Sequence, residues 1–406
     1  MAFCIYSTRT IMDVSKRILS LSPSATLSLN TKARELSRQG RKIINAAVGE
    51  PNFSTPEIIV ESAIEELRKG NTKYGPAGGS LELRTAISDK LKRDNNLSYD
   101  PSEICVGSGA KEVLFHAFLA LLNEGDEVLL PAPYWVSYEE QIKAAGAKAV
   151  LVPPPKPFKS PYLTPADLEK LVTAKTKAIV LCSPHNPCGF TLSRDELKSL
   201  GSYLASKDWW IISDEIYEYL SFDAPHVSIL NTTPELKEKT LLINGLSKGF
   251  AMTGWRVGYA AGPKKIIDLL VTLHGHSSTC LPPFIEKAAT KALNFGRSLM
   301  QEHLETLKKR RDYALSLAKE IPDIEVIHPS GAFYLFLDLQ KALERSSYQG
   351  NTLKFCDYLL EKLSLACVPG EAFGLPGYVR FSYGICEEDI KEGLTSLKQG
   401  LANQSL

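Results

Sequence analysis

Four short stretches of the sequence contain reactive side chains that a parallel sheet would bring close together. Asp214 directly follows the apolar segment 209–213, and Lys248 comes shortly after the apolar segment 240–244. In open α/β sheets, ligands bind beyond the carboxyl ends of the strands, so such residues can meet in one pocket. The other two stretches hold Asn186 and Arg256. A helix cap or turn is the simpler alternative for Asp214 considered alone.

The neighbours of Lys248 favour a covalent role for its amine. A lysine between apolar segments usually lies at the surface with its charge in water. Here Ser247 and Arg256 flank it, and both residue types bind phosphate well. A lysine that can form a Schiff base, beside phosphate ligands and downstream of a strand-end aspartate, is the arrangement that pyridoxal 5'-phosphate requires. The spacing therefore predicts a site for this cofactor.

Short apolar segments alternate with helix-like segments through most of the chain. Strands are expected at 103–107, 127–131, 148–153, 177–182, 209–213, 240–244 and 256–261. Helices are expected at 57–69, 81–93, 111–122, 136–145 and 194–206. This alternation predicts an α/β fold with a large, mainly parallel sheet covered on both faces.

The pattern changes near residue 300, which predicts a smaller α+β domain. One long helix is expected over 295–320, followed by strands and helices at 325–328, 332–338, 352–363, 378–382 and 387–401. We expect a loose extension over 1–12, a segment packing with the small domain over 13–48, a large cofactor-binding domain over 49–300 and a small domain over 301–406.

Composition argues against several other classes of protein. The 47 basic and 46 acidic residues give a net charge of +1, so neither a nucleic acid nor a membrane is the expected partner. The eight cysteines include no C-x-x-C pair, which favours reduced thiols in a cytoplasmic protein. His274 and His276 lack nearby ligands at metal spacing, so we interpret them as ordinary polar residues and expect no metal.

Six segments together resemble the class I aminotransferases of pyridoxal-phosphate fold type I. They are residues 48–53, 72–75, 133–138, 183–189, 213–218 and 247–256. The nearest subgroup is the bacterial-type aspartate and prephenate aminotransferases, and the resemblance runs from about residue 14 to about residue 401. None of these motifs is specific alone, but their combination is.

The resemblance implies roles for the residues around the cofactor. Lys248 would hold pyridoxal phosphate as a Schiff base and then move a proton, as the cofactor passes through its pyridoxamine phosphate form. Asp214 would pair with the pyridine nitrogen, while Tyr217 and Asn186 would bind the ring hydroxyl and Trp135 would stack on the ring. Ser247, Arg256 and the backbone amides of Ala110 and Lys111 would bind the phosphate.

The resemblance also implies a substrate site and a homodimer with shared active sites. Arg380 would clamp the substrate α-carboxylate, with Gly49 offering backbone and Asn186 and Trp135 adding contacts. Lys111 would bind a distal carboxylate, which favours aspartate or glutamate as amino donor and 2-oxo acids such as 2-oxoglutarate as acceptor. Tyr74 would reach the phosphate of the neighbouring subunit.

Two alternatives remain open at this stage. Subgroup members that accept prephenate or aromatic substrates often carry a lysine where this chain has Ser22. A C–S lyase could use the same lysine on the same fold, although a lyase has no need of a distal cation. His185 and Cys188 also depart from the usual residues beside Asn186, and either could tune the cofactor.

Overall fold

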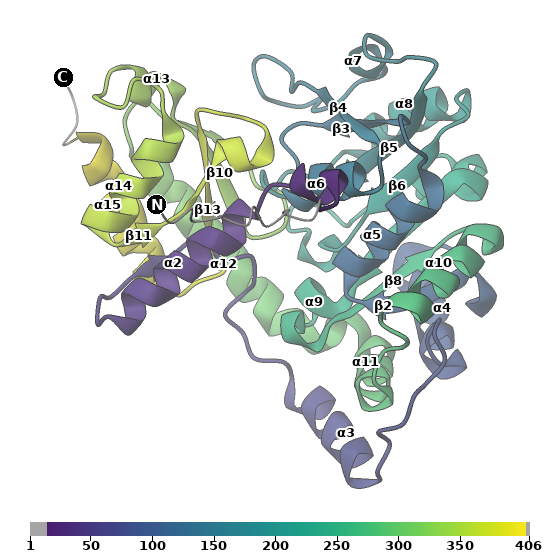
Figure 1. The fold of residues 1–406 in the computed structure, drawn as a ribbon. Helices are drawn as coiled ribbons and strands as arrows, with labels where there is room; N and C mark the ends of the chain where they lie inside the picture. Colours follow the sequence, from purple (N-terminus) through teal and green to yellow (C-terminus); the bar gives the residue numbers. More distant parts are fainter. Residues whose placement is uncertain (1–13, 403–406) are drawn as a thin grey trace, which may run out of the picture.

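The computed structural model describes residues 14–402, so the expected extension over 1–12 lies outside the described residues (Figure 1). A seven-stranded sheet in the order β2-β8-β7-β6-β5-β3-β4 forms the large part of the molecule. Only β8 runs against its neighbours β2 and β7. The strands are β2 (Ile104–Ser108), β3 (Glu127–Pro131), β4 (Lys148–Val152), β5 (Thr176–Cys182), β6 (Trp210–Asp214), β7 (Thr240–Gly245) and β8 (Val257–Ala261).

Both faces of this sheet are buried, as the apolar strand sequences predict. On β5, Ile179 and Leu181 face one hydrophobic core, while Ala178 and Val180 face the other. This alternation follows from the two-residue period of a strand. The helices of this part are α3 (Glu57–Arg68), α4 (Leu81–Asn95), α5 (Ala110–Leu121), α6 (Ser137–Ala144), α7 (Pro165–Glu169), α8 (Arg194–Ala205), α9 (Leu246–Gly249), α10 (Lys264–Ser277) and α11 (Pro283–Phe295).

The smaller part is built on a four-stranded antiparallel sheet in the order β12-β13-β10-β9. The N-terminal helix α2 packs against β11 and β12, and β1 pairs in parallel with β11 (Figure 1). The remaining elements are α1 (Lys16–Leu19), α2 (Ala25–Arg38), β1 (Ile44–Asn45), α12 (Gln301–Ala318), β9 (Glu325–Ile327), β10 (Tyr334–Asp338), α13 (Gln340–Glu344), α14 (Thr352–Leu363), β11 (Leu365–Ala366), β12 (Val368–Pro369), β13 (Tyr378–Ser382) and α15 (Glu387–Ala402).

The predicted fold class is confirmed, but the single helix expected over 295–320 is wrong. Helix α11 ends at Phe295, a 3-10 turn follows over Gly296–Met300, and α12 begins at Gln301. Gly296 has φ +64°, which lies outside the right-handed helical region and forces the break. Helix α11 packs against α3 and α4, whereas α12 packs against α15 and β10. The domain boundaries themselves stay a prediction.

The sequence patterns did not single out three long helices. These are α2, α10 and α11, of which α2 contributes residues to the wall of the cavity described below. Among residues 14–402, no helix is both long enough and apolar enough to span a bilayer.

Candidate active site

A cavity of about 410 Å³ opens at the carboxyl ends of the large-sheet strands and reaches Arg380 on the smaller sheet. Its size is ordinary for a small-molecule site. Eleven of the twelve predicted site residues line it: Gly49, Ala110, Lys111, Trp135, Asn186, Asp214, Tyr217, Ser247, Lys248, Arg256 and Arg380. Tyr74 does not line it, and its side chain is 88% exposed.

The wall of this cavity carries an excess of positive charge. The cations are Arg34, Lys111, Lys248, Arg256 and Arg380, and the acids are Glu50 and Asp214. Five cationic residues against two acidic ones favour an anionic ligand, because charges of one sign in a concave site reinforce one another.

Asp214 ends β6 and is almost fully buried. One carboxylate oxygen accepts a hydrogen bond from the Tyr138 hydroxyl at 2.5 Å, and the other accepts one from the Ile216 amide at 3.2 Å. Burial raises the pKa of Asp214 to about 6, because the charged form has lost most of its water. A carboxylate in this state gains from a cationic partner that a ligand brings.

Lys248 projects into the cavity from the short helix α9 at the end of β7. Its Nζ donates a hydrogen bond to the Gly49 carbonyl at 2.5 Å. Burial lowers the pKa of Lys248 to about 8. The amine is therefore much easier to deprotonate than an ordinary lysine, and a neutral amine is the nucleophile that Schiff-base chemistry needs.

A phosphate-sized cradle lies where α5 begins. Gly109 precedes the helix with φ +86°, and a Cβ at that position would overlap the Arg256 guanidinium. That guanidinium donates hydrogen bonds to the carbonyls of Thr253 at 2.9 Å and Ser108 at 3.1 Å. The first amides of α5 have no partners within the helix, so the helix start and the guanidinium together favour an anion.

Arg380 is a buried cation without a carboxylate partner among residues 14–402. Its guanidinium donates to Asn186 Oδ1 at 3.0 Å and to the Ala47 carbonyl at 2.8 Å, while its Nε has no hydrogen-bond partner. It lies 4.4 Å from the centroid of the Tyr334 ring. The side chain is only 2% exposed, and a buried charge with incomplete pairing is costly.

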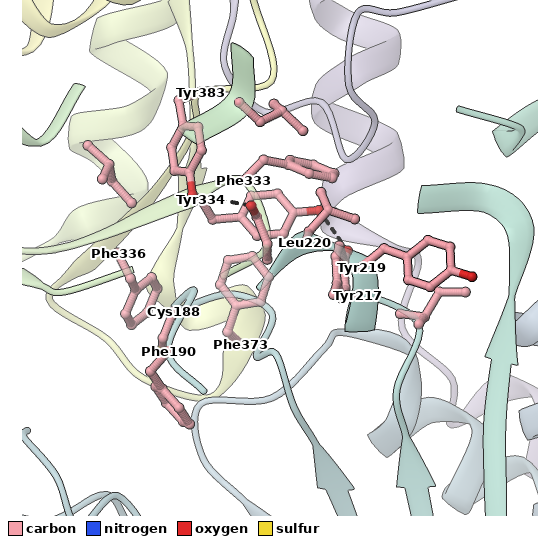
Figure 2. Close-up of a cluster of buried hydrophobic side chains, with 14 of the residues drawn as sticks. Cys188, Phe190, Tyr217, Tyr219, Leu220, Phe333, Tyr334, Phe336, Phe373 and Tyr383 are labelled. Carbon is pink, nitrogen blue, oxygen red and sulfur yellow. Dashed lines mark hydrogen bonds between the residues drawn. The ribbon is translucent and has the colours of Figure 1, made fainter. Parts of the chain in front are cut away.

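Two tyrosines contribute to this site although the sequence did not identify them as functional residues. Tyr138 holds Asp214, and Tyr334 shares a 2.9 Å hydroxyl–hydroxyl hydrogen bond with Tyr217 (Figure 2). Tyr138 lies within the segment 133–138, which carried part of the family resemblance, and this position could have identified it as a site residue. Tyr334 comes from the other sheet, about a hundred residues downstream of Tyr217, so no local pattern joins the two.

Lys111 and Trp135 lie together at the cavity wall. The Lys111 Nζ lies 4.9 Å from the centroid of the Trp135 indole, and Trp135 packs edge-on against Tyr138. Desolvation, reinforced by the nearby Arg256 charge, lowers the pKa of Lys111. The cation thus stands in the cavity beside other positive charges, which an incoming anion would offset.

His185 and Cys188 do not belong to the cavity wall. The imidazole of His185 stacks on Phe190 with centroids 4.3 Å apart, and Cys188 is completely buried in the aromatic cluster of Figure 2. Burial lowers the pKa of His185 to about 3 and raises that of Cys188. Both departures from the usual sequence serve packing in this structure.

This fold and cavity define a pyridoxal-phosphate enzyme of fold type I, and comparisons with known proteins agree. The family model "Aminotransferase class I and II" matches residues 41–397. A "Probable aspartate/prephenate aminotransferase" of Aquifex aeolicus is 42% identical over 96% of this chain and 98% of its own length. An "Aspartate aminotransferase" of Bacillus subtilis is 40% identical over 97% of this chain and 100% of its own length.

Solved structures give the same result. An aspartate aminotransferase from Thermus thermophilus with maleate superposes with a TM-score of 0.89 at 36% identity, covering 96% of this chain and all of that one. One from Rhizobium meliloti gives 0.91 at 34% identity, covering 97% of this chain and all of that one. The chain therefore belongs to the class I and II aminotransferase family, and it is an aminotransferase that uses pyridoxal phosphate.

The cavity fits that cofactor by the chemistry of its wall. A low-pKa lysine, a buried carboxylate in need of a cation, and an anion cradle at a helix start face one cavity. These correspond to the aldehyde, the pyridine nitrogen and the phosphate of pyridoxal phosphate.

Proposed function

We propose that this enzyme moves the amino group between L-aspartate or L-glutamate and 2-oxo acids such as 2-oxoglutarate. The observation that carries the proposal is Arg380, a buried guanidinium without a carboxylate partner in the described chain. A substrate α-carboxylate would supply the missing anion through parallel hydrogen bonds. The names of the Aquifex and Bacillus relatives point to the same substrates.

The proposed chemistry assigns one task to each residue on the cofactor side. Pyridoxal phosphate supplies the electron sink. Lys248 holds the cofactor and then moves a proton at the substrate Cα, for which a pKa of about 8 suits an amine near neutral pH. Asp214, held by Tyr138, keeps the pyridine nitrogen protonated. Tyr217 and Asn186 bind the ring hydroxyl, and Trp135 stacks on the ring.

The phosphate and the two ends of the substrate bind elsewhere on the wall. Arg256, Ser247 and the amides of Ala110 and Lys111 hold the phosphate in the cradle beside Gly109. Arg380 binds the α-carboxylate next to the Gly49 backbone. The Lys111 ammonium binds the distal carboxylate, and this contact distinguishes acidic amino acids from neutral ones.

A single-turnover panel tests the substrate proposal. Cofactor-loaded protein is mixed with aspartate, glutamate, alanine or phenylalanine, and the loss of the lysine-bound cofactor absorbance is followed. The proposal predicts fast loss with aspartate and glutamate and slow loss with the neutral amino acids. Loss that is equally fast with alanine would contradict a dicarboxylate preference, and no loss with either acid would reject the substrate proposal.

A second candidate activity, the prephenate–arogenate reaction, rests on the name of the Aquifex relative. Ser22 stands where a lysine accompanies that activity in the subgroup, and its amide donates to Glu140 at 2.8 Å. Arogenate is therefore added to the same panel. A rate comparable to that of glutamate would establish the second activity, and a rate no faster than that of alanine would exclude it.

We infer that the enzyme works as a homodimer with shared active sites. Tyr74 is a large aromatic residue that is 88% exposed and does not line the cavity of its own chain, which suits contact with a second subunit. In the proposed dimer its hydroxyl binds the phosphate held by the partner.

Hybrid dimers test this inference. Tyr74→Phe and Lys248→Ala subunits are mixed, unfolded and refolded together with pyridoxal phosphate. Each hybrid contains one site with both native residues, so activity should exceed that of either parent dimer. Activity no higher than the sum of the parents would show that Tyr74 does not act across an interface.

A further inference from the structure

Three potential metal ligands gather on the far side of the phosphate cradle, outside the active-site wall. Glu112 and His116 lie one turn apart on α5, and His274 comes from α10, which packs against α5. One ligand atom from each residue can be chosen so that all three lie within 4.8 Å of one another. The Glu112 carboxylate lies 3.6 Å from His274 Nδ1, and the two imidazoles meet edge-on with centroids 6.0 Å apart.

His274 provides an independent reason to expect a ligand. The side chain is 1% exposed, and neither ring nitrogen has a hydrogen-bond partner among the described residues. Buried polar groups in folded proteins are almost always paired, so an unpaired imidazole facing a carboxylate and a second imidazole requires an explanation. The two histidines of this helix differ in burial, because His274 is enclosed whereas His276 is exposed.

Gly107 keeps the space beside this cluster open. A Cβ at that position would lie 3.1 Å from a Glu112 carboxylate oxygen and 3.2 Å from His274 Nδ1. Any side chain at position 107 would therefore crowd the two groups. The glycine therefore lets the backbone of β2 lie close to the Glu112 carboxylate and the His274 imidazole.

The donor set matches a divalent transition metal. Imidazole nitrogens and a carboxylate oxygen bind Zn²⁺ at roughly 2.0–2.2 Å, and three protein ligands plus one further oxygen complete a four-coordinate site. A spacing of four residues on a helix places Glu112 and His116 on one face. The Ser277 hydroxyl lies 3.1 Å from His116 Nε2 and orients this imidazole through a hydrogen bond.

We propose that Glu112, His116 and His274 form a binding site for one zinc-class divalent ion per chain. Glu112 also accepts a hydrogen bond from the Ser108 amide at 2.6 Å, and the Ser108 carbonyl accepts one from Arg256. The bound ion thus joins α5 to α10 and steadies the loop that forms the phosphate cradle. The role is structural, and the ion does not touch substrate or cofactor.

Metal binding by the cofactor-loaded protein tests the proposal. The protein is stripped with a chelator and reloaded with pyridoxal phosphate, and Zn²⁺ uptake is measured by equilibrium dialysis with elemental analysis. We expect one ion per chain and a thermal midpoint that rises with zinc. His274→Gln and His116→Gln should each weaken binding by more than about tenfold, in line with loss of a direct ligand.

His276→Gln is the matched control, because His276 lies on the same helix but is exposed. It should bind zinc like the parent chain. Binding of Co²⁺ to the unmutated protein provides a second readout. Its visible absorption should show a tetrahedral nitrogen–oxygen site, and this test does not depend on the folding of any variant. No zinc uptake, or uptake that His274→Gln leaves unchanged, would overturn the proposal and leave the cluster as a packing feature only.

Discussion

The two ends of the active-site cavity bury charges of opposite sign. At one end, Asp214 is a buried carboxylate that accepts hydrogen bonds from Tyr138 and Ile216, and its pKa is raised to about 6. At the other end, Arg380 is a buried guanidinium that donates to Asn186 and Ala47 and keeps one donor unused. Each end holds a charge whose counterion is absent from the described chain.

The opposite signs indicate which charge a ligand must carry at each end. Because a buried charge without a counterion is unfavourable, the Asp214 end gains from a cation and the Arg380 end from an anion. In the proposed function, a protonated pyridine ring and a substrate α-carboxylate would provide these charges. Lys248, between the two ends, has a pKa lowered to about 8 and can change its charge during the reaction.

Replacing the central lysine should have the largest effect. Lys248→Ala removes both the covalent anchor and the proton carrier, so kcat should fall by more than roughly 10⁴-fold. Borohydride treatment followed by peptide mapping should place the trapped cofactor on Lys248 in the parent chain and on no lysine in the variant. Trapping on another lysine, with activity retained, would contradict the assignment.

Substitutions at Asp214 test whether its negative charge is needed at this end of the cavity. Asp214→Asn keeps the shape but removes the charge, so kcat should fall by roughly 10²- to 10³-fold, the usual loss of one preorganised electrostatic partner. Asp214→Glu keeps the charge and should lose much less. Single-turnover rates are compared at equal cofactor occupancy. Equal rates for the Asn and Glu variants would show that the charge is unimportant.

The titration of Lys248 predicts how cofactor attachment depends on pH. Attack on the aldehyde requires the neutral amine, so the rate at which the apoprotein binds pyridoxal phosphate covalently should rise with pH and level off above a midpoint of about 8. An unperturbed lysine would give a midpoint of 10.5. Stopped-flow absorbance measures the profile, and a rate still rising steeply at pH 10 would contradict the lowered pKa.

Lys111 should have the smallest effect, and only on acidic substrates. Lys111→Gln should lower kcat/KM for aspartate by about tenfold, the scale of one hydrogen bond to a charged group, while the value for alanine stays nearly constant. Lys265→Gln, an exposed lysine on α10, is the control and should change neither value. Parallel losses for aspartate and alanine would assign Lys111 to the cofactor rather than to the distal carboxylate.

Much of the active site could be predicted because it follows local sequence. Asp214 ends β6 and Lys248 follows β7 closely, and the strand pattern places both at one sheet edge. Arg256 instead directly precedes β8, and it reaches the same edge because β8 runs antiparallel to its neighbours. The fold class followed from the same alternation. The break at Gly296 could not be seen, because helix-forming residues flank it on both sides and a single glycine within a helical pattern is often tolerated.

Contacts between segments that are distant in the sequence could not be predicted. Tyr334 meets Tyr217, and His274 meets Glu112, only because separate helices and sheets pack together. The metal-spacing argument for His274 considered only neighbours in sequence, whereas Glu112 and His116 lie on α5. Long-range pairings of this kind have no signature in one sequence without the fold.

A chemical double-mutant cycle can show whether the buried Arg380 guanidinium binds the substrate α-carboxylate. The kcat/KM values of L-aspartate and its α-amide are measured for the parent enzyme and for Arg380→Leu, with Arg345→Gln as an exposed arginine control. We expect amidation to cost about 2–5 kcal/mol in the parent, as for other buried charge pairs, and little in Arg380→Leu. An equal cost in both proteins would show that the buried guanidinium does not receive the α-carboxylate.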